Sequence, residues 1–134
     1  LRLVGSEMCI RDSLSMHALI GAYQPQGYEW VDELNQVLAG NIEYFCTYAK
    51  KHWKGVAFSR PQGTYMVFLD CTEWCREHGR DIQWLLDEGA RVGVGYQDGR
   101  PFHGPCHIRV NLALPLSRVK EACDRLDRYV FNAR

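Results

Sequence analysis

The sequence predicts a small α+β domain, in which helices cover one face of a small mixed sheet. Three observations lead to this fold class. A long stretch in the first half has apolar side chains at helical spacing, residues 64–70 and 106–114 have the composition or the alternation of strands, and a second helical stripe closes the chain. Amphipathic helices and half-buried strands of this kind pack as two layers around one core.

The long helix is expected over residues 28–53. Its apolar positions, from Val31 to Ala49, recur at steps of three and four. Gly40 lies inside this stripe and costs about 1 kcal/mol relative to alanine, which makes it a candidate for a helix break. Residues 14–23 are interpreted as the end of an earlier helix, and residues 24–29 as a turn.

The strands and the remaining helices are expected after Gly55. A short strand, a Pro-Gln-Gly turn and a strand over residues 64–70 come first. A short helix over 81–89 that ends at Gly89, a short buried strand over 90–95 and a loop over 96–105 follow. The last helix is expected to begin at Pro115, with Ser117 as its N-cap.

Composition limits the classes of partner. The chain has 134 residues, 46% apolar and 24% charged, and its sixteen basic side chains balance sixteen acidic ones. Neither a basic surface for nucleic acid nor an apolar run of the ~20 residues that span a bilayer is expected. The six cysteines lie without the loop-rich texture of a disulfide scaffold, so the sequence favours free thiols and a cytoplasmic location.

The first thirteen residues, "LRLVGSEMCIRDS", have neither a helical nor a strand period. They resemble a translated adapter sequence of the kind found at the ends of assembled reading frames. Residues 1–13 are therefore expected to be a non-native leader, and fold reasoning starts at residue 14.

The strand over residues 106–114 carries the main candidate for chemistry. One face is apolar throughout, and Arg109 lies in the middle of the other. Its guanidinium is a planar fork of donors that matches a carboxylate or a phosphate. From the pattern alone, Arg109 is either a solvated side chain on an outer face or a ligand contact beside a glycine-rich loop.

A metal site is not expected. His103, Cys106 and His107 lie close in sequence, but neighbouring residues of an extended strand point to opposite faces. Their spacing fits neither a zinc motif nor a haem attachment motif.

Four stretches together resemble a known enzyme family. They are "YEWVDELNQVLAGNIEYF" (28–45), "SRPQGTYMVFLDC" (59–71), "GVGYQDGRPFHGPCHIRVNLALP" (93–115) and "SRVKEACDRLDRYV" (117–130). The chain resembles the C-terminal part of a fold-type I pyridoxal-phosphate (PLP) enzyme of the aminotransferase class I/II family. Arg109-x-Asn111-x-Ala113, leading into Pro115 and Ser117, is the most specific motif. The Gln-Asp-Gly and Phe-His-Gly stretches indicate the cystathionine β-lyase subgroup (MalY/PatB-type).

The resemblance implies a domain division and a role for Arg109. Residues 14–53 correspond to the end of the large domain and its linking helix, and residues 54–134 to the small domain. Arg109 corresponds to the arginine that binds the α-carboxylate of the amino-acid substrate. Four further residues near the site entrance are weaker candidates for substrate binding: Tyr96, Gln97, Asp98 and Phe102.

The family's catalytic and cofactor-binding groups belong to the large domain. The four lysines of this chain, at positions 50, 51, 54 and 120, match no Schiff-base motif. The resemblance therefore implies no catalytic residue and no cofactor-binding residue here, and the chain alone is expected to be inactive.

For the parent protein, the resemblance implies a homodimeric, PLP-dependent carbon–sulfur β-lyase that acts on cystathionine or a cysteine S-conjugate. An aminotransferase is the alternative within the family, because both reactions need the same carboxylate contact. A stand-alone α+β module that binds amino acids is the alternative outside it.

Overall fold

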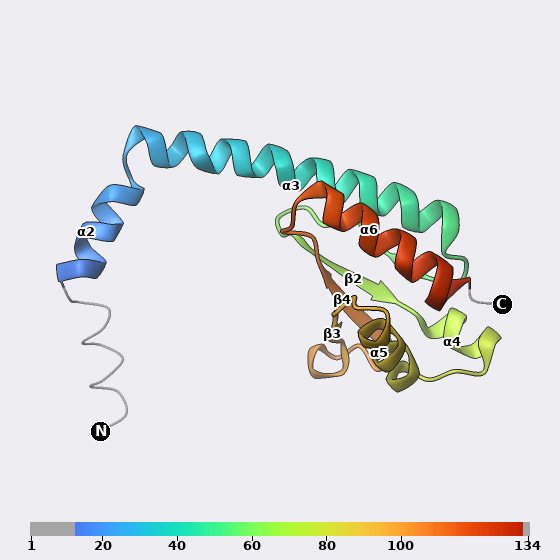
Figure 1. Cartoon of the computed structure of the whole chain (residues 1–134). Coiled ribbons are helices and arrows are strands. Elements are labelled where there is room, and N and C mark those ends of the chain that lie inside the picture. Colours follow the sequence, from blue (N-terminus) through green and yellow to red (C-terminus); the bar gives the residue numbers. More distant parts are fainter. Residues whose placement is uncertain (1–12, 133–134) are drawn as a thin grey trace, which may run out of the picture. The chain divides into compact units, whose positions relative to one another are not determined.

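The computed structural model describes residues 13–132, which fall into two compact units that divide between Gln36 and Val37. Most of the expected leader, residues 1–12, lies outside the described part. The first unit contains α2 (Ser13–Ala22) and the beginning of α3 (Pro25–His52) (Figure 1), and no residue of α2 is buried. Among the described helices, none combines the length and the apolar character that a membrane span requires.

The second unit is built on a four-stranded sheet. The strands β1 (Ala57–Phe58), β2 (Met66–Asp70), β4 (His107–Asn111) and β3 (Gln97–Asp98) lie side by side in that order. Every neighbouring pair is antiparallel, so the sheet is antiparallel rather than mixed as expected. The α+β prediction itself is confirmed.

Four helices of the second unit share one core with the sheet. They are the second part of α3, α4 (Thr72–His78), α5 (Ile82–Arg91) and α6 (Leu116–Leu126), which a π-helical turn extends over Asp127–Phe131. In the central strands, every second side chain enters this core: Val67, Leu69, Ile108 and Val110. The residues between them remain at least partly exposed, so one face of the sheet is packed and the other is open.

The helix α3 runs without interruption through Gly40, so the break considered there does not occur. Within the second unit, its buried positions include Ile42, Phe45 and Ala49, at the spacing of one helical face. Asn41 is also buried, and its side-chain amide donates hydrogen bonds to the carbonyls of Leu112, at 2.9 Å, and Leu114, at 2.7 Å. These bonds tie α3 to the segment between β4 and α6.

The region 81–95 differs from the expectation. Asp81 caps α5 by accepting a hydrogen bond from the Trp84 backbone N–H at 2.8 Å, but the helix continues past Gly89 to Arg91. Residues 90–95 therefore contain the end of the helix and a turn. The prediction of a strand over these residues is wrong. A Cβ at Gly89 would lie 2.4 Å from the Tyr96 ring, so this glycine permits close packing rather than ending the helix.

Three smaller elements also differ. The helix α4 was not expected, because it is one short segment with only Trp74 and Cys75 buried. The expected loop over 96–105 contains β3 and a 3-10 turn, Arg100–Phe102. Ser117 does not cap α6: Pro115 occupies the N-cap position and no side chain caps the helix.

Two helical glycines give opposite predictions for substitution by alanine. Gly40→Ala is expected to raise the free energy of unfolding by about 0.5–1 kcal/mol, because no atom lies within 4 Å of the new Cβ and alanine favours helix. Gly89→Ala is expected to lower it by about 1–3 kcal/mol, because the Cβ meets the Tyr96 ring. Urea unfolding measures both, and a neutral Gly89→Ala variant would contradict the close packing of Tyr96.

Candidate functional site

The candidate site lies on the open face of the sheet. Three residues form a row across its central and edge strands: Phe68 in β2 and Gln97 in β3 are both register partners of Arg109 in β4. Because register partners in an antiparallel sheet project from the same face, the three side chains are neighbours. The alternate positions on β2 and β4 fill the core, which leaves this row on the opposite side.

Arg109 is half-buried, whereas every other arginine within residues 13–132 is exposed. Its guanidinium carbon lies 3.9 Å from the centroid of the Phe102 ring. Across that same part of the chain, no carboxylate pairs with Arg109 and no group makes a hydrogen bond with its guanidinium. A partly shielded cation without a counter-ion is costly to bury, so the position suits an anionic ligand.

The four weaker candidates divide into two pairs. Gln97 and Phe102 lie beside Arg109, the first by strand register and the second by ring contact. Tyr96 does not lie beside Arg109. Its hydroxyl donates a hydrogen bond to the Leu85 carbonyl, and burial raises the pKa of this hydroxyl. Asp98 is the register partner of the core residue Ile108, so it also lies on the other face.

Asp98 is engaged with the loop that follows it. Its carboxylate accepts a hydrogen bond from the Arg100 backbone N–H at 2.9 Å and another from the Arg100 Nε at 2.7 Å. The contact with Arg100 holds the pKa of the Asp98 carboxyl below its usual value. Tyr96 and Asp98 are thus occupied within the fold, while Gln97 and Phe102 adjoin the unpaired guanidinium.

Three residues on the open face were not among the candidates for substrate binding. The Phe68 ring lies 4.6 Å from the His107 ring, and the His107 Nε2 lies 3.8 Å from the Asp70 carboxylate. Together with Ala57, Phe58 and Ser59 they line an open groove of about 420 Å³. The alternation of "MVFLD" could have placed Phe68 and Asp70 on this face, once its pairing with residues 107–111 was considered.

Asp70 also lies two residues before Thr72, the first residue of helix α4. It accepts hydrogen bonds from the Thr72 backbone N–H, at 2.9 Å, and from the Thr72 hydroxyl, at 2.6 Å. Partial desolvation alone would raise the pKa of the Asp70 carboxyl, but these two bonds and the nearby His107 lower it overall. The carboxylate therefore stays charged at neutral pH.

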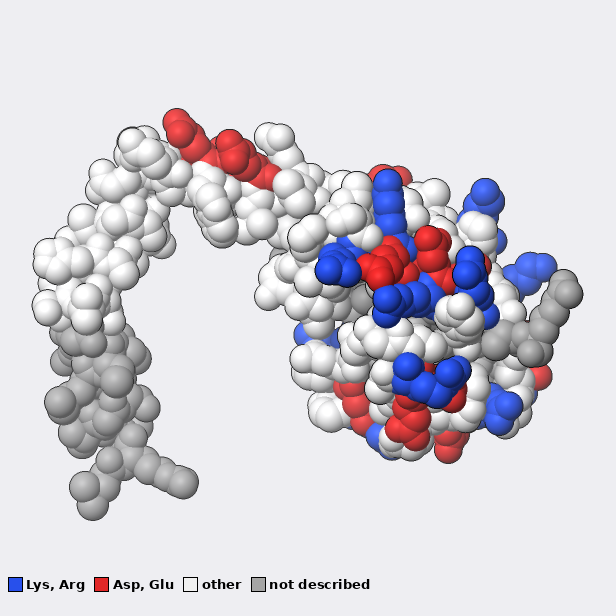
Figure 2. Space-filling view, viewed as in Figure 1, with Lys and Arg blue, Asp and Glu red and all other residues white. Residues whose placement is uncertain are grey.

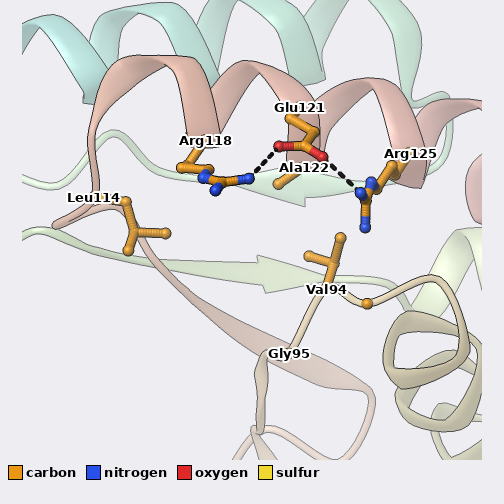
Figure 3. Close-up of a pocket in the computed structure, with 8 residues that line it drawn as sticks. Val94, Gly95, Leu114, Arg118, Glu121, Ala122 and Arg125 are labelled. Atoms are coloured by element: carbon orange, nitrogen blue, oxygen red, sulfur yellow. Dashed lines mark hydrogen bonds and ion pairs between the residues drawn. The ribbon is translucent and has the colours of Figure 1, made fainter.

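A second hollow provides a contrast with Arg109. It has a volume of about 340 Å³ and lies between α6 and residues 93–95 (Figure 3). Glu121 accepts hydrogen bonds there from Arg118, at 2.9 Å, and from Arg125, at 2.5 Å. Both arginines of this hollow therefore have a carboxylate contact, which Arg109 lacks within the described part of the chain.

The surface around α6 has mixed charge. On the face shown in Figure 2, lysine and arginine side chains of the second unit alternate with acidic ones, without a continuous basic patch. The arginine–glutamate contacts of α6 belong to this pattern.

The described cysteines and histidines form no metal cluster. Within residues 13–132, no group of three or more metal-binding side chains could hold an ion. The described cysteines, Cys46, Cys71, Cys75, Cys106 and Cys123, are all free. Burial raises the pKa of Cys75 and Cys123 to about 12, which keeps these two thiols protonated and unreactive.

Comparison with known proteins gives the class of the fold. The chain superimposes with a TM-score of 0.76 on a PLP-bound C-S lyase from Staphylococcus hominis, 24% identical, covering 87% of this chain and 30% of that structure. It superimposes with the same TM-score, 0.76, on a Thermus thermophilus aspartate aminotransferase that is 18% identical, covering 89% of this chain and 30% of that structure. The second unit therefore has the fold of a part of the PLP-dependent C-S lyases and aminotransferases.

Comparison of amino-acid sequences indicates which subgroup of these enzymes the chain resembles. No family model matches the chain. A Mycobacterium leprae protein named "Putative cystathionine beta-lyase" is 33% identical to it, over 81% of this chain and 30% of the relative. The chain thus spans about a third of the length of the curated relatives it matches. The resemblance to the cystathionine β-lyase subgroup of the PLP enzymes is confirmed.

Proposed function

We propose that this chain is the C-terminal, small-domain part of a PLP-dependent carbon–sulfur β-lyase, and that Arg109 binds the α-carboxylate of the amino-acid substrate. The observation that carries the proposal is the half-buried guanidinium on the open face of the sheet, which has no carboxylate partner within residues 13–132. The similarity to cystathionine β-lyases supports the reaction class.

Arg109 would act by fixing the orientation of the substrate. Two parallel N–H groups of a guanidinium match the two oxygens of a carboxylate, so one contact sets both position and rotation. Holding an amino acid by its α-carboxylate fixes the direction in which the bonds at its α-carbon point. This positioning converts a random encounter into a defined geometry, which is a large part of what a binding site contributes to a reaction rate.

In this proposal, none of the described lysines is the covalent anchor for PLP. Lys50, Lys51, Lys54 and Lys120 are all exposed. Lys50 and Lys120 lie over the rings of Phe58 and Tyr44, at 5.9 Å and 5.3 Å. None of the four is among the residues that line the groove. In this proposal the cofactor and its chemistry belong to the remainder of the parent protein.

The proposal extends to the organisation of the parent. Residues 1–13 are a non-native leader, residues 14–53 are the end of the large domain with its linking helix, and residues 54–134 are the small domain. The parent is a cytoplasmic homodimer that acts on a small amino acid, with no nucleic-acid or membrane partner.

An aminotransferase is the second candidate. The equal structural similarity to an aspartate aminotransferase favours it, because a carboxylate contact on this fold serves both reactions. The two differ in the fate of the substrate. A β-lyase releases pyruvate and ammonia from cystathionine or a cysteine S-conjugate, whereas an aminotransferase needs a second keto acid as amino acceptor.

The coding sequence upstream of Leu14 provides the direct test. It is expected to encode the missing domain with a Schiff-base lysine, and the joined protein is expected to release pyruvate from cystathionine without an added keto acid. Turnover that depends on an added keto acid would establish the aminotransferase instead. A native start codon near Ser15, with no upstream domain, would overturn the enzyme assignment and favour the stand-alone module.

The chain alone should not form a specific adduct with PLP. Adding PLP to the purified 134-residue protein is expected to give no saturable imine absorption band, because its lysines are solvated and lie outside the candidate site. A saturable band that is lost when one lysine is replaced would contradict the assignment of the cofactor site to another part of the parent.

A further inference from the structure

The loop between β3 and β4, residues 99–104, is folded tightly onto the strand that carries Arg109. The Gly99 backbone N–H donates to the His107 carbonyl at 2.8 Å, and the His107 backbone N–H donates to the Gly104 carbonyl at 3.2 Å. Within the loop, the Phe102 and Gly104 backbone N–H groups both donate to the Gly99 carbonyl, at 2.9 and 3.1 Å. The loop is therefore a closed, hydrogen-bonded turn.

Two glycines allow the loop to approach this closely. A Cβ at Gly99 would lie 2.4 Å from the His107 carbonyl oxygen. A Cβ at Gly104 would lie 2.5 Å from the Phe68 ring and 2.6 Å from the His107 Cβ. Either side chain would push the loop off the sheet, because these distances are far below van der Waals contact.

The turn is also held from outside and is strained at one residue. Asp98 binds Arg100 at both its backbone and its side chain, and the Arg100 Nη2 donates to Gln83 in α5 at 3.0 Å. His103 has a φ of 62°, and among residues 13–132 it is the single non-glycine residue with a positive φ. Such a conformation persists only where the surroundings impose it, and it is concentrated at functional sites.

These hydrogen bonds and close contacts determine the position of Phe102. Phe102 is 48% exposed, yet its ring centroid lies 3.9 Å from the guanidinium carbon of Arg109. The guanidinium carbon lies over the ring at this distance. A guanidinium that stacks on an aromatic ring keeps its N–H groups free, because these point outward in the guanidinium plane. The ring limits rotation of the side chain without consuming a donor.

We propose that the loop 99–104 is a clamp in which Phe102 is a positioning residue: it holds the Arg109 guanidinium so that its N–H edge faces a carboxylate. This role deepens the proposed function and rests on it. Phe102 itself does not bind the carboxylate. It lowers the conformational cost that Arg109 incurs when a carboxylate binds, which is the general benefit of a preorganised site.

The experiment uses the 134-residue chain and NMR of its arginine side chains. The Arg109 Nε–Hε signal is identified by its loss in Arg109→Lys, and the ring current of Phe102 is expected to shift it upfield. Sodium acetate is the carboxylate probe, with sodium chloride at equal ionic strength as the reference. Phe102→Ala and Phe102→Leu are expected to abolish the upfield shift and to weaken acetate binding by about two- to fivefold. Phe102→Tyr is expected to retain both the upfield shift and the strength of acetate binding.

Tyr129→Ala is the matched control, because Tyr129 is an exposed aromatic under another arginine, Arg128, at 5.8 Å. It should leave the Arg109 signal and acetate binding unchanged. An Arg109 signal that is the same in Phe102→Ala as in the unmodified chain overturns the clamp. Equally strong acetate binding by Phe102→Leu and Phe102→Tyr also overturns the clamp.

The same titration separates the clamp from the proposed function. If the upfield shift is present in the unmodified chain but acetate does not perturb it beyond the chloride reference, the carboxylate site at Arg109 is overturned. In that case the clamp's effect on binding is overturned with it, while the ring contact stands as a structural feature.

Discussion

Trp53→Ala is expected to lower the free energy of unfolding by about 3–5 kcal/mol, enough to unfold a domain of this size in part. Trp53 is 2% exposed and follows directly after α3. Its ring stacks on Phe131 with centroids 4.5 Å apart and meets the edge of Phe45 at 5.5 Å. It thus joins the end of the long helix to the end of the chain, and alanine would leave a cavity between them.

Urea unfolding, followed by far-UV circular dichroism, measures this effect. Trp30→Ala is the control, since Trp30 is 62% exposed and its loss should change stability by less than about 0.5 kcal/mol.

Trp53→Phe is expected to lower the free energy of unfolding much less than Trp53→Ala does. The indole N–H of Trp53 is buried with no hydrogen-bond partner in the described part of the chain, and phenylalanine removes this unpaired donor. Equal stabilities for Trp53→Ala and Trp30→Ala would contradict the packing described here.

The elements with long, regular patterns could be predicted from the sequence. The apolar stripe of α3 and the alternation of β4 each depend on one buried face, which imposes a repeat on the residues themselves. The helix α4 and the strand β3 are too short to show a repeat. Gly89 was misinterpreted because a glycine that admits a neighbouring ring and a glycine that ends a helix are identical in sequence.

The site was predictable in part for the same reason. Alternation assigned Arg109 to the polar face of its strand, and the resemblance gave that arginine a role. The neighbours of Arg109 depend on strand register, which the turn over residues 99–104 determines. Because Gln97 is the register partner of Arg109, Tyr96 and Asp98 must point to the other face. The hydrogen bonds of this turn determine the register, and periodicity carries no information about them.

In the complete β-lyase proposed above, Arg109→Lys is expected to lower kcat/KM by about 10²–10³-fold. This range is about 3–4 kcal/mol, which lies within the loss expected for one or two charge-assisted hydrogen bonds in a shielded site at about 1.5–3 kcal/mol each. Lysine keeps the positive charge, but it offers a point charge instead of a planar fork and it loses the flat contact with Phe102. Steady-state release of pyruvate from cystathionine measures the change.

Arg128→Lys is the matched control, because Arg128 also lies over an aromatic ring but is exposed and distant from β4 in sequence. It should leave kcat/KM unchanged. A second comparison isolates the α-carboxylate: a substrate analogue in which an amide replaces it should react poorly with the unmodified enzyme. Since the amide cannot form the charged pair, Arg109→Lys should reduce its turnover far less than that of the acid. If the lysine variant lost activity equally toward acid and amide, the damage would be to the fold, and Arg109 would not be the residue that recognises the carboxylate.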